Sequence, residues 1–252
     1  ICPSRGLGDV YKRQISFLSE SLMEKIAIQL WKNTNLEDNE FKGFLLNEFP
    51  STLKDEILSY QVNLADDDVS DASGLIQSSY PPSPNAVLFL KVNSLFHVEE
   101  KLNILESHAK RFFSYIVSES KILEIDESNN LGHRTEGFSQ IVFLEKPEHM
   151  DVYDWFDHWT HYHTEIAIET QSNFIYTQNT VVRRLQKDAP KFIAIIEECF
   201  PLGAMTDQEE FYAAKGNPSL MKQNLNIMME SCSKFIDFSK IEVIPTSRYL
   251  VI

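Results

Sequence analysis

The chain has 252 residues, of which 43% are hydrophobic and 12% aromatic, enough apolar material for a packed core. Its formal net charge of −14, with no basic stripe interleaved with aromatics, argues against a nucleic-acid partner, because an acidic chain repels phosphate. No apolar run approaches the roughly 18 residues that a membrane span needs. We therefore expect a cytoplasmic protein with no membrane partner.

The first 14 residues, ICPSRGLGDVYKRQ, resemble translated sequencing-adapter read-through and fit no later pattern. Met23 then opens the stretch MEKIAIQLWK, which predicts a first strand because apolar and polar residues alternate. We expect residues 1–22 to be an artefact or a disordered leader, and the fold to begin at residue 23.

Residues 23–126 predict the element order β-α-β-β-α-β. Alternating or continuous apolar runs indicate strands, and apolar residues recurring every three or four positions indicate helices. The predicted elements are strand 24–31, helix 39–49, strand 57–64, strand 86–92, helix 98–115 and strand 121–125. The stretch 66–84, rich in Asp, Ser and Pro, is predicted to be a long, mobile loop that could act as a lid.

A polar linker at 127–137 precedes residues 138–252, which repeat the same order. The predicted elements are strand 138–145, helix 151–170, strand 173–183, strand 191–199, helical residues 207–235 and strand 241–250. A β-α-β-β-α-β sheet leaves one apolar face uncovered, and a second copy can cover it. The sequence therefore predicts an α+β protein in which two ferredoxin-like halves, related by internal duplication, form a dimeric α+β barrel within one chain.

The predicted helix 151–170 concentrates aromatics and histidines. Helical spacing places His163 on its core-facing stripe with Trp155 and Trp159. A buried imidazole needs a partner for its ring nitrogens, because an unpaired buried polar group costs about 1–3 kcal/mol. Two interpretations remain open: a core histidine bonded to a backbone carbonyl, or a titratable group that lines a pocket.

The spacing H-x2-H-x-H within this helix suggests a metal site, but the helix geometry opposes it. On a regular helix His158 and His161 share a face, whereas His163 points about 140° away from His158. We expect His158 and His161 to be solvated, with i,i+4 partners in Asp154 and Glu165. No metal site is predicted.

Other common site motifs are missing from the sequence. There is no Gly-rich phosphate loop among only 8 glycines, so no nucleotide or flavin cofactor is expected. Cys199 and Cys232 lack C-x2-C spacing and are predicted to be reduced core residues. Together with the histidine geometry, this predicts a protein that works without a cofactor.

Three motifs in the second half resemble those of EthD-domain proteins, a family of the dimeric α+β barrel superfamily. They are an aromatic followed by W-x3-H (Phe156, Trp159, His163), a strand ending E-E-x-F (Glu197, Glu198, Phe200) and a tail S-x3-F-I-D (Ser231, Phe235, Ile236, Asp237). Each motif is weak alone, and their order and spacing carry the resemblance over 138–252.

The resemblance implies a pocket between the sheet and its helices for a small hydrophobic, often aromatic, molecule. It also implies that the helix histidine, His163, faces this pocket. The family is loosely classed with oxidoreductases, and its superfamily includes cofactor-free monooxygenases, isomerases, cyclases, dehydratases and decarboxylases. Fold alone does not decide among these reactions.

For such a pocket we predict His163 as the catalytic acid or base, kept neutral by burial. Tyr176 and Asn173 are candidate donors to a substrate oxygen, and only one should serve because they point to opposite strand faces. Glu198 is the third catalytic candidate: it and Glu197 straddle a strand, and the one facing the helices could orient His163 or act as a second acid.

Aromatic side chains should supply the wall of the pocket. The candidate substrate contacts, besides Asn173, are Trp155, Phe156, Trp159 and Phe200. Each of these aromatics also fits an ordinary helix-on-sheet core. In the first half Phe49 takes the position of His163, and a phenylalanine cannot move a proton, so one competent pocket is expected, in the second half.

The sequence thus predicts an EthD-like enzyme that acts without nucleotide or metal on a small hydrophobic or aromatic substrate, polyketide-like or xenobiotic. It would use His-mediated proton transfer, as an oxidoreductase or a lyase or isomerase. The alternative is a non-catalytic binding or carrier protein with the same pocket. A weaker third option is an assembly module with no enclosed pocket. Pairing into a homodimer is left open.

Overall fold

The computed structural model describes residues 23–252, so the expectation for residues 1–22 lies outside the described part of the chain. The strands are β1 (Glu24–Lys32), β2 (Ile57–Leu64), β3 (Gln77–Ser78), β4 (Ala86–Val92), β5 (Ala109–Leu123), β6 (Phe138–Leu144), β7 (Ile175–Arg184), β8 (Ala194–Phe200) and β9 (Ile241–Leu250). The α-helices are α2 (Asp38–Gly43), α3 (Phe49–Thr52), α4 (Leu95–Val98), α5 (Val152–Asp157), α6 (Thr164–Thr170), α7 (Gln208–Phe211) and α8 (Pro218–Phe235).

Eight of these strands form a closed antiparallel barrel. Their order is β2-β4-β1-β5-β7-β8-β6-β9, and β9 pairs with β2 to close the ring. Each half contributes four adjacent strands in the same relative order, and the halves also meet where β5 pairs with β7. The predicted dimeric α+β barrel within one chain is therefore confirmed.

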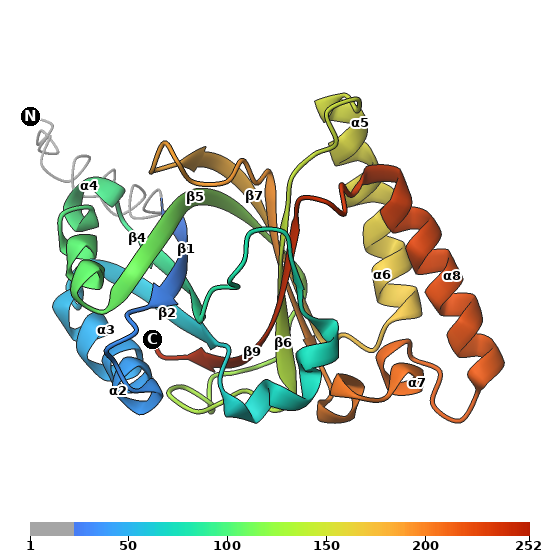
Figure 1. Cartoon of the computed structure of the whole chain (residues 1–252), viewed down its shortest axis with the longest axis horizontal. Coiled ribbons are helices and arrows are strands. Elements are labelled where there is room, and N and C mark those ends of the chain that lie inside the picture. Colours follow the sequence, from blue (N-terminus) through green and yellow to red (C-terminus); the bar gives the residue numbers. More distant parts are fainter. Residues whose placement is uncertain (1–22) are drawn as a thin grey trace, which may run out of the picture.

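Helices cover the barrel from two sides. The helices of the first half, α2 to α4, lie against one side, and α5, α6 and α8 lie against the other (Figure 1). One apolar core fills the space under the first-half helices, a second fills the barrel interior, and a third lies beneath α5, α6 and α8. The third core borders the site described below.

The barrel interior also holds a buried polar network. Glu197 Oε1 lies 3.1 Å from Arg248 Nε and accepts hydrogen bonds from Gln61, Asn63 and Ser139. These side chains come from strands of both halves, since β2 supplies two of them and β6, β8 and β9 the others. The network therefore ties the halves together at their junction.

The prediction of a helix at 98–115 is wrong from Ala109 onward. A short 3-10 helix (Lys101–Ser107) is followed by the long strand β5. Both faces of β5 are buried: Phe112 and Ile116 pack in the first-half core, whereas Phe113, Tyr115 and Val117 pack in the barrel interior. A strand buried on both faces loses its alternating pattern, and its apolar residues then match helical spacing by coincidence.

The expected mobile loop at 66–84 contains regular structure, which corrects that prediction. It forms a 3-10 helix (Asp67–Leu75) and the strand β3, which pairs with β9. Val69 and Ala72, three residues apart, are buried against Phe138 and Phe200 of the second half. This packing across the halves anchors a segment whose polar composition indicated a loop.

A π-helical turn interrupts the first helical segment of each half. One spans Phe44–Glu48, between α2 and α3, and the other spans His158–His163, between α5 and α6. A π-helix bonds residue i to i+5 and so aligns side chains five positions apart. In the first half this turn brings the Phe44 and Phe49 rings to 5.9 Å.

Candidate functional site

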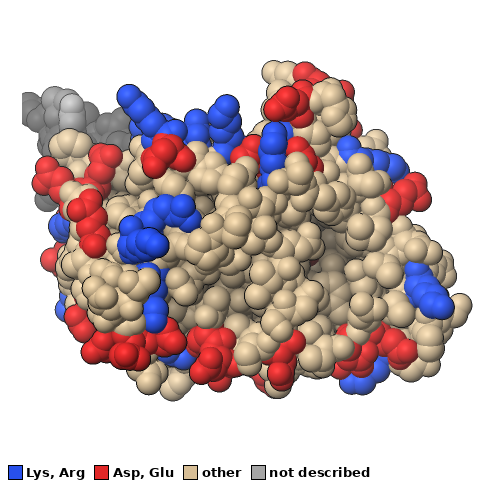
Figure 2. Space-filling model, viewed as in Figure 1, with Lys and Arg blue, Asp and Glu red and all other residues tan. Residues whose placement is uncertain are grey.

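A cavity of about 520 Å³ lies between the sheet of the second half and helix α8. Figure 2 shows the surface hollowed between the barrel and the second-half helices, and acidic side chains along the edge that carries α2 and α7. The first half contributes to the cavity through Asp71, Leu75 and Gln77, from the segment predicted as a lid. The cavity is thus completed by both halves.

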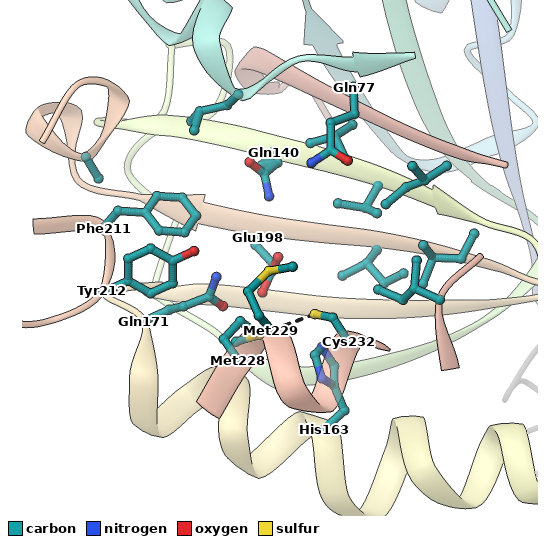
Figure 3. A pocket seen from close by; sticks show the side chains of 18 of the residues that line it. Gln77, Gln140, His163, Gln171, Glu198, Phe211, Tyr212, Met228, Met229 and Cys232 are labelled. Atoms are coloured by element: carbon teal, nitrogen blue, oxygen red, sulfur yellow. Dashed lines mark hydrogen bonds between the residues drawn. The ribbon is translucent and has the colours of Figure 1, made fainter. Parts of the chain in front are cut away.

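The apolar part of the lining comes mainly from the helices and the sheet. Its larger members are Val142, Leu144, Trp159, Ile196, Met205, Phe211, Met228, Met229, Phe235 and Phe238. The polar part includes Gln140, His163, Gln171, Tyr176 and Glu198, several of which point into the same space in Figure 3. An apolar wall with a few convergent polar groups is typical of small-molecule sites.

His163 reaches the cavity from the π-helical turn. Its side chain is 9% exposed, and its Nδ1 lies 2.9 Å from Ser231 Oγ on α8. Burial, and then the nearby His158, lower the pKa of His163 to about 4. The imidazole is therefore neutral at physiological pH, as the sequence predicted for a buried group.

His158 does not behave as predicted. Its Nε2 lies 3.1 Å from Ser231 Oγ and 3.2 Å from the Ser231 carbonyl oxygen, so it is half-buried and bonded to Ser231 instead of Asp154. The π turn explains the difference, because residues five apart share a face and His158 and His163 both reach Ser231. A regular α-helix would have separated them.

His161 is exposed, as expected, but its partner differs from the prediction. Its Nδ1 lies 3.0 Å from Asp157 Oδ1, one turn earlier, and not against Glu165. Within residues 23–252, no group of three or more His, Cys, Asp or Glu side chains is placed to hold a metal ion. The histidines of this helix are instead bonded to a serine and a carboxylate.

Glu198 faces the cavity from β8, and its neighbour Glu197 points into the barrel, so the predicted division of the pair is observed. Glu198 is 8% exposed and accepts one hydrogen bond, from Asn173 Nδ2 at 3.2 Å. Burial raises the pKa of Glu198 to about 7, because no cation offsets the loss of water. Its carboxyl group can therefore exchange a proton at neutral pH.

The predicted contact between Glu198 and His163 is not formed in the described structure. Ser231 holds the imidazole instead, and Glu198 is held by Asn173. Asn173 does not itself line the cavity, and its Oδ1 has no partner among the described residues. Its place beside Glu198 makes it a support for the carboxyl group.

Tyr176 lines the cavity, but its hydroxyl is already bonded within the protein. The oxygen accepts a hydrogen bond from Gln178 Nε2 at 3.2 Å, and the residue is 1% exposed. Burial, and then Glu198, raise the pKa of Tyr176 well above its usual value. Tyr176 therefore forms part of the wall as a neutral phenol.

Of the four predicted aromatic contacts, Trp159 lines the cavity and the other three lie behind it. Trp155 is fully buried and donates from Nε1 to the Phe235 carbonyl at 2.8 Å. Phe156 packs at the edge of the same core. Phe200 stacks at 4.5 Å on Phe211, which does reach the cavity.

Sequence reasoning missed the lining supplied by α8 and by the segment before it. Met228 and Cys232 of α8, with Tyr212 before it, face the cavity. Their helical spacing indicated a buried face but not which cavity it would border. Cys232 is not a reactive thiol, because burial raises its pKa to about 12.

The matching position in the first half is closed. Phe41, Leu45 and Phe49, which correspond to Trp155, Trp159 and His163, are packed in the first-half core. Tyr60 fills the adjoining space and donates from its hydroxyl to the Leu45 carbonyl at 2.9 Å. Phe49 stands at the position of His163, so this position carries no titratable group.

The chain is an α+β barrel protein with a cavity under the helices of its second half. The EthD domain family model matches residues 147–239, which lie within this half. No curated protein matches the chain. In the described residues, none of the helices combines the length and apolar character required to cross a bilayer.

Several solved structures are similar in fold. An anthrone oxidase-like protein has 9% sequence identity, a TM-score of 0.56 and 93% coverage of both chains. A protein from Lactobacillus acidophilus NCFM, provisionally called a monooxygenase, has 10% identity, a TM-score of 0.49 and coverage of 91% of this chain and 95% of its own. A mutant chlorite dismutase from Candidatus Nitrospira defluvii has 8% identity, a TM-score of 0.45 and coverage of 91% and 93%. At these identities the likeness concerns the fold.

Proposed function

We propose that this protein is a cofactor-independent enzyme that transfers protons on a small hydrophobic, aromatic substrate bound in the EthD-domain cavity. The observation that carries the proposal is that two buried titratable groups, Glu198 and His163, face one largely apolar cavity. Burial raises the pKa of Glu198 to about 7 and lowers that of His163 to about 4. Groups whose environments shift their pKa values in this way are characteristic of acid–base sites.

The two groups take different roles. A carboxyl group with a pKa near neutrality is present in both forms, so Glu198 can remove a proton and return it. His163 is neutral at that pH and is a weak base, because its conjugate acid has a pKa of about 4. Glu198 therefore replaces His163 as the proposed base, and His163 becomes a hydrogen-bonding partner for the substrate oxygen on which charge develops.

The cavity supports an aromatic substrate of modest size. Its volume of about 520 Å³ falls within the range of roughly 300–1,000 Å³ that small-molecule pockets occupy. Trp159, Phe211 and Phe235 offer ring faces and edges, and Met228 and Met229 add adaptable apolar surface. The EthD domain and the anthrone oxidase-like fold relative favour a polyketide-like or xenobiotic aromatic compound.

The reaction is of oxidoreductase, lyase or isomerase type. Removal of a proton from a carbon beside a carbonyl produces an enolate, and removal of a phenolic O–H proton produces a phenolate; such an anion is an intermediate that these three reaction types can share. The carboxylate form of Glu198 would take this proton, and His163 would stabilise the oxyanion. Neither step requires a nucleotide or a metal ion.

The test is to incubate the full chain with aromatic lactones, hydroxyquinones and a crude metabolite extract, and to follow consumption by mass spectrometry. Glu198→Gln and His163→Gln keep side-chain size and polarity while removing the acid and the imidazole. Glu165→Gln and His161→Gln make the same changes at exposed positions of the neighbouring helix and serve as matched controls. The product mass identifies dehydration, decarboxylation or oxygenation.

Consumption that is lost in both cavity variants and retained in both controls would support the proposal. A compound that is bound and never consumed, equally by wild type and both cavity variants, would contradict it. That second result would establish the alternative function, a binding or carrier protein. A ligand-dependent rise in Tm that is unchanged in the variants would give the same answer independently.

A further inference from the structure

Ser231 and His158 form, with His163, a hydrogen-bonded group at the edge of the cavity. Ser231 lies on α8 and is 1% exposed, whereas both histidines lie in the π-helical turn. Ser231 Oγ lies 2.9 Å from His163 Nδ1 and 3.1 Å from His158 Nε2. The ring of His163 points from its helix into the cavity (Figure 3).

The Ser231 carbonyl oxygen, which lies beside His158, determines where the protons of the three side chains lie. His158 Nε2 lies 3.2 Å from the Ser231 carbonyl oxygen as well as near Oγ. A carbonyl oxygen only accepts hydrogen bonds, so His158 must carry a proton on Nε2. This N–H is directed at both the carbonyl oxygen and the hydroxyl oxygen of Ser231.

The hydroxyl hydrogen of Ser231 then has one partner. Ser231 Oγ receives the N–H of His158, and no hydrogen bond from Oγ to a helix carbonyl occurs among the described residues. The acceptor within reach is His163 Nδ1 at 2.9 Å. If Nδ1 carried a proton instead, Ser231 Oγ would face two donors, and its own hydrogen would be buried without an acceptor.

We propose that Ser231, itself bonded to His158, fixes His163 as the tautomer that carries its proton on Nε2, so that the imidazole presents an N–H to the cavity. Ser231 and His158 are positioning residues, and His163 is the group that meets the ligand. Its ligand chemistry is therefore an oxygen that accepts a hydrogen bond, such as a ketone, a quinone or a developing oxyanion. The use of this N–H in catalysis rests on the proposed function, but the tautomer does not.

Two features of the fold support this assignment. Phe44 and Phe49 occupy the corresponding i,i+5 positions of the first half and pack on each other, with His108 stacked on Phe44, so the turn itself needs no polar group at these two positions. The second half places histidines at the two positions that phenylalanines occupy in the first half. Burial also keeps His163 neutral, with a pKa of about 4, which a fixed neutral tautomer requires.

The test uses nitrogen-15 NMR on the full chain without ligand at pH 7, because the shifts of the two ring nitrogens report which one is protonated. The chain has 7 histidines, so the His163 signals are identified as those missing from His163→Gln. We expect an unprotonated Nδ1 and a protonated Nε2. In Ser231→Ala the ratio of the Nε2–H to the Nδ1–H tautomer should fall roughly fivefold, the effect of losing one hydrogen bond.

Matched variants separate a positioning role from a general effect on folding. Ser231→Thr keeps the hydroxyl and should retain the wild-type tautomer. Ser233→Ala makes the same change two residues away on α8, where the hydroxyl is exposed and bonds to the Glu230 carbonyl, and should change nothing. If Ser231→Ala does not fold, a second variant, His158→Phe, replaces it and copies Phe44 of the first half. This variant removes the N–H that orients Ser231, so the ratio of the Nε2–H to the Nδ1–H tautomer of His163 should also fall.

A protonated Nδ1 in the wild type, or a wild-type ratio in the folded Ser231→Ala or His158→Phe variant, would overturn the proposal. These results do not depend on turnover, so they remain distinct from a failure of the proposed enzyme. If a substrate is found, Ser231→Ala should lower kcat with little change in KM, and Ser231→Thr should restore it. A purely structural loss would not be rescued in this selective way.

Discussion

Glu197 and Glu198 are consecutive residues of β8 whose carboxyl groups lie in opposite environments. Glu197 points into the barrel, where Arg248 Nε lies 3.1 Å away and three neutral side chains donate to it. Glu198 points into the cavity, where Asn173 is the one hydrogen-bond donor that it has among the described residues. The first carboxylate holds the barrel together, and the second, with its raised pKa, carries the proposed chemistry.

Replacing Glu198 with glutamine should change how stability depends on pH. The folded pKa of about 7 lies above the ordinary value of 4.5, so the folded state retains a proton that the unfolded state loses between these values. Ionisation of Glu198 should therefore lower the free energy of unfolding of the wild type by about 2 kcal/mol between pH 5 and pH 8. Urea unfolding of both proteins at these pH values should show a smaller loss for Glu198→Gln; equal losses would show that Glu198 ionises normally.

Replacing His163 should affect the opposite end of the pH range. Its folded pKa of about 4 lies below the ordinary 6.5, so the unfolded state binds the proton first and stability falls as the solution becomes acidic. Protonation linked to His163 should lower the free energy of unfolding of the wild type by about 2 kcal/mol between pH 7 and pH 5. His163→Gln should lack that part of the decline, measured by urea unfolding, with exposed His161→Gln as the control that keeps it.

Glu197→Gln should destabilise the barrel by about 3 kcal/mol, since it leaves the buried Arg248 without one of its two carboxylate partners. Chemical denaturation would measure this loss. Adding Arg248→Met should recover part of it, because the uncompensated charge is then removed. The same Glu-to-Gln change at Glu230, in an exposed pair with Lys234, should stay within about 0.5 kcal/mol. Similar effects at the two positions would contradict the role assigned to the network.

Gly137, the residue before β6, should not accept a side chain. Its φ is +91°, and a Cβ atom there would lie 2.1 Å from the Phe200 carbonyl oxygen. Gly137→Ala should therefore cost more than about 3 kcal/mol, through strain and displacement of β8. Gly132→Ala, with φ of +76° and no atom within 4 Å, should cost about 1 kcal/mol. Thermal unfolding of the pair separates steric contact from backbone strain.

The strands that sequence predicted well are those with a simple environment. The bounds of β2, β4 and β9 match the predicted 57–64, 86–92 and 241–250, because their apolar runs end at clear polar or turn residues. The sequence of strand β5 predicts a helix instead, because the two faces of the strand enter different cores and its apolar residues do not alternate. A strand is buried on both faces only when the sheet closes into a barrel, and a short stretch of sequence does not show that closure.

The site was predicted in part for similar reasons. Strand alternation placed Glu198 opposite Glu197, and helical spacing placed His163 on a buried face. The contact between His158 and Ser231 was missed because a regular helix was assumed across a π-helical turn. The cavity lining from the segment that contains Leu75 and Gln77 depends on packing between the halves, which spacing along the chain does not reveal.

Because of the π-helical turn at His158–His163, the alignment of these two side chains depends on the number of residues in the helix. A π turn holds one residue more than the α-helical turn it replaces, so deleting a single exposed residue such as His161 would restore regular hydrogen bonding. Every residue before the deletion would then rotate by about 100° relative to those after it. The shortened protein would gain a better helix and lose the meeting of His158 and His163 at Ser231.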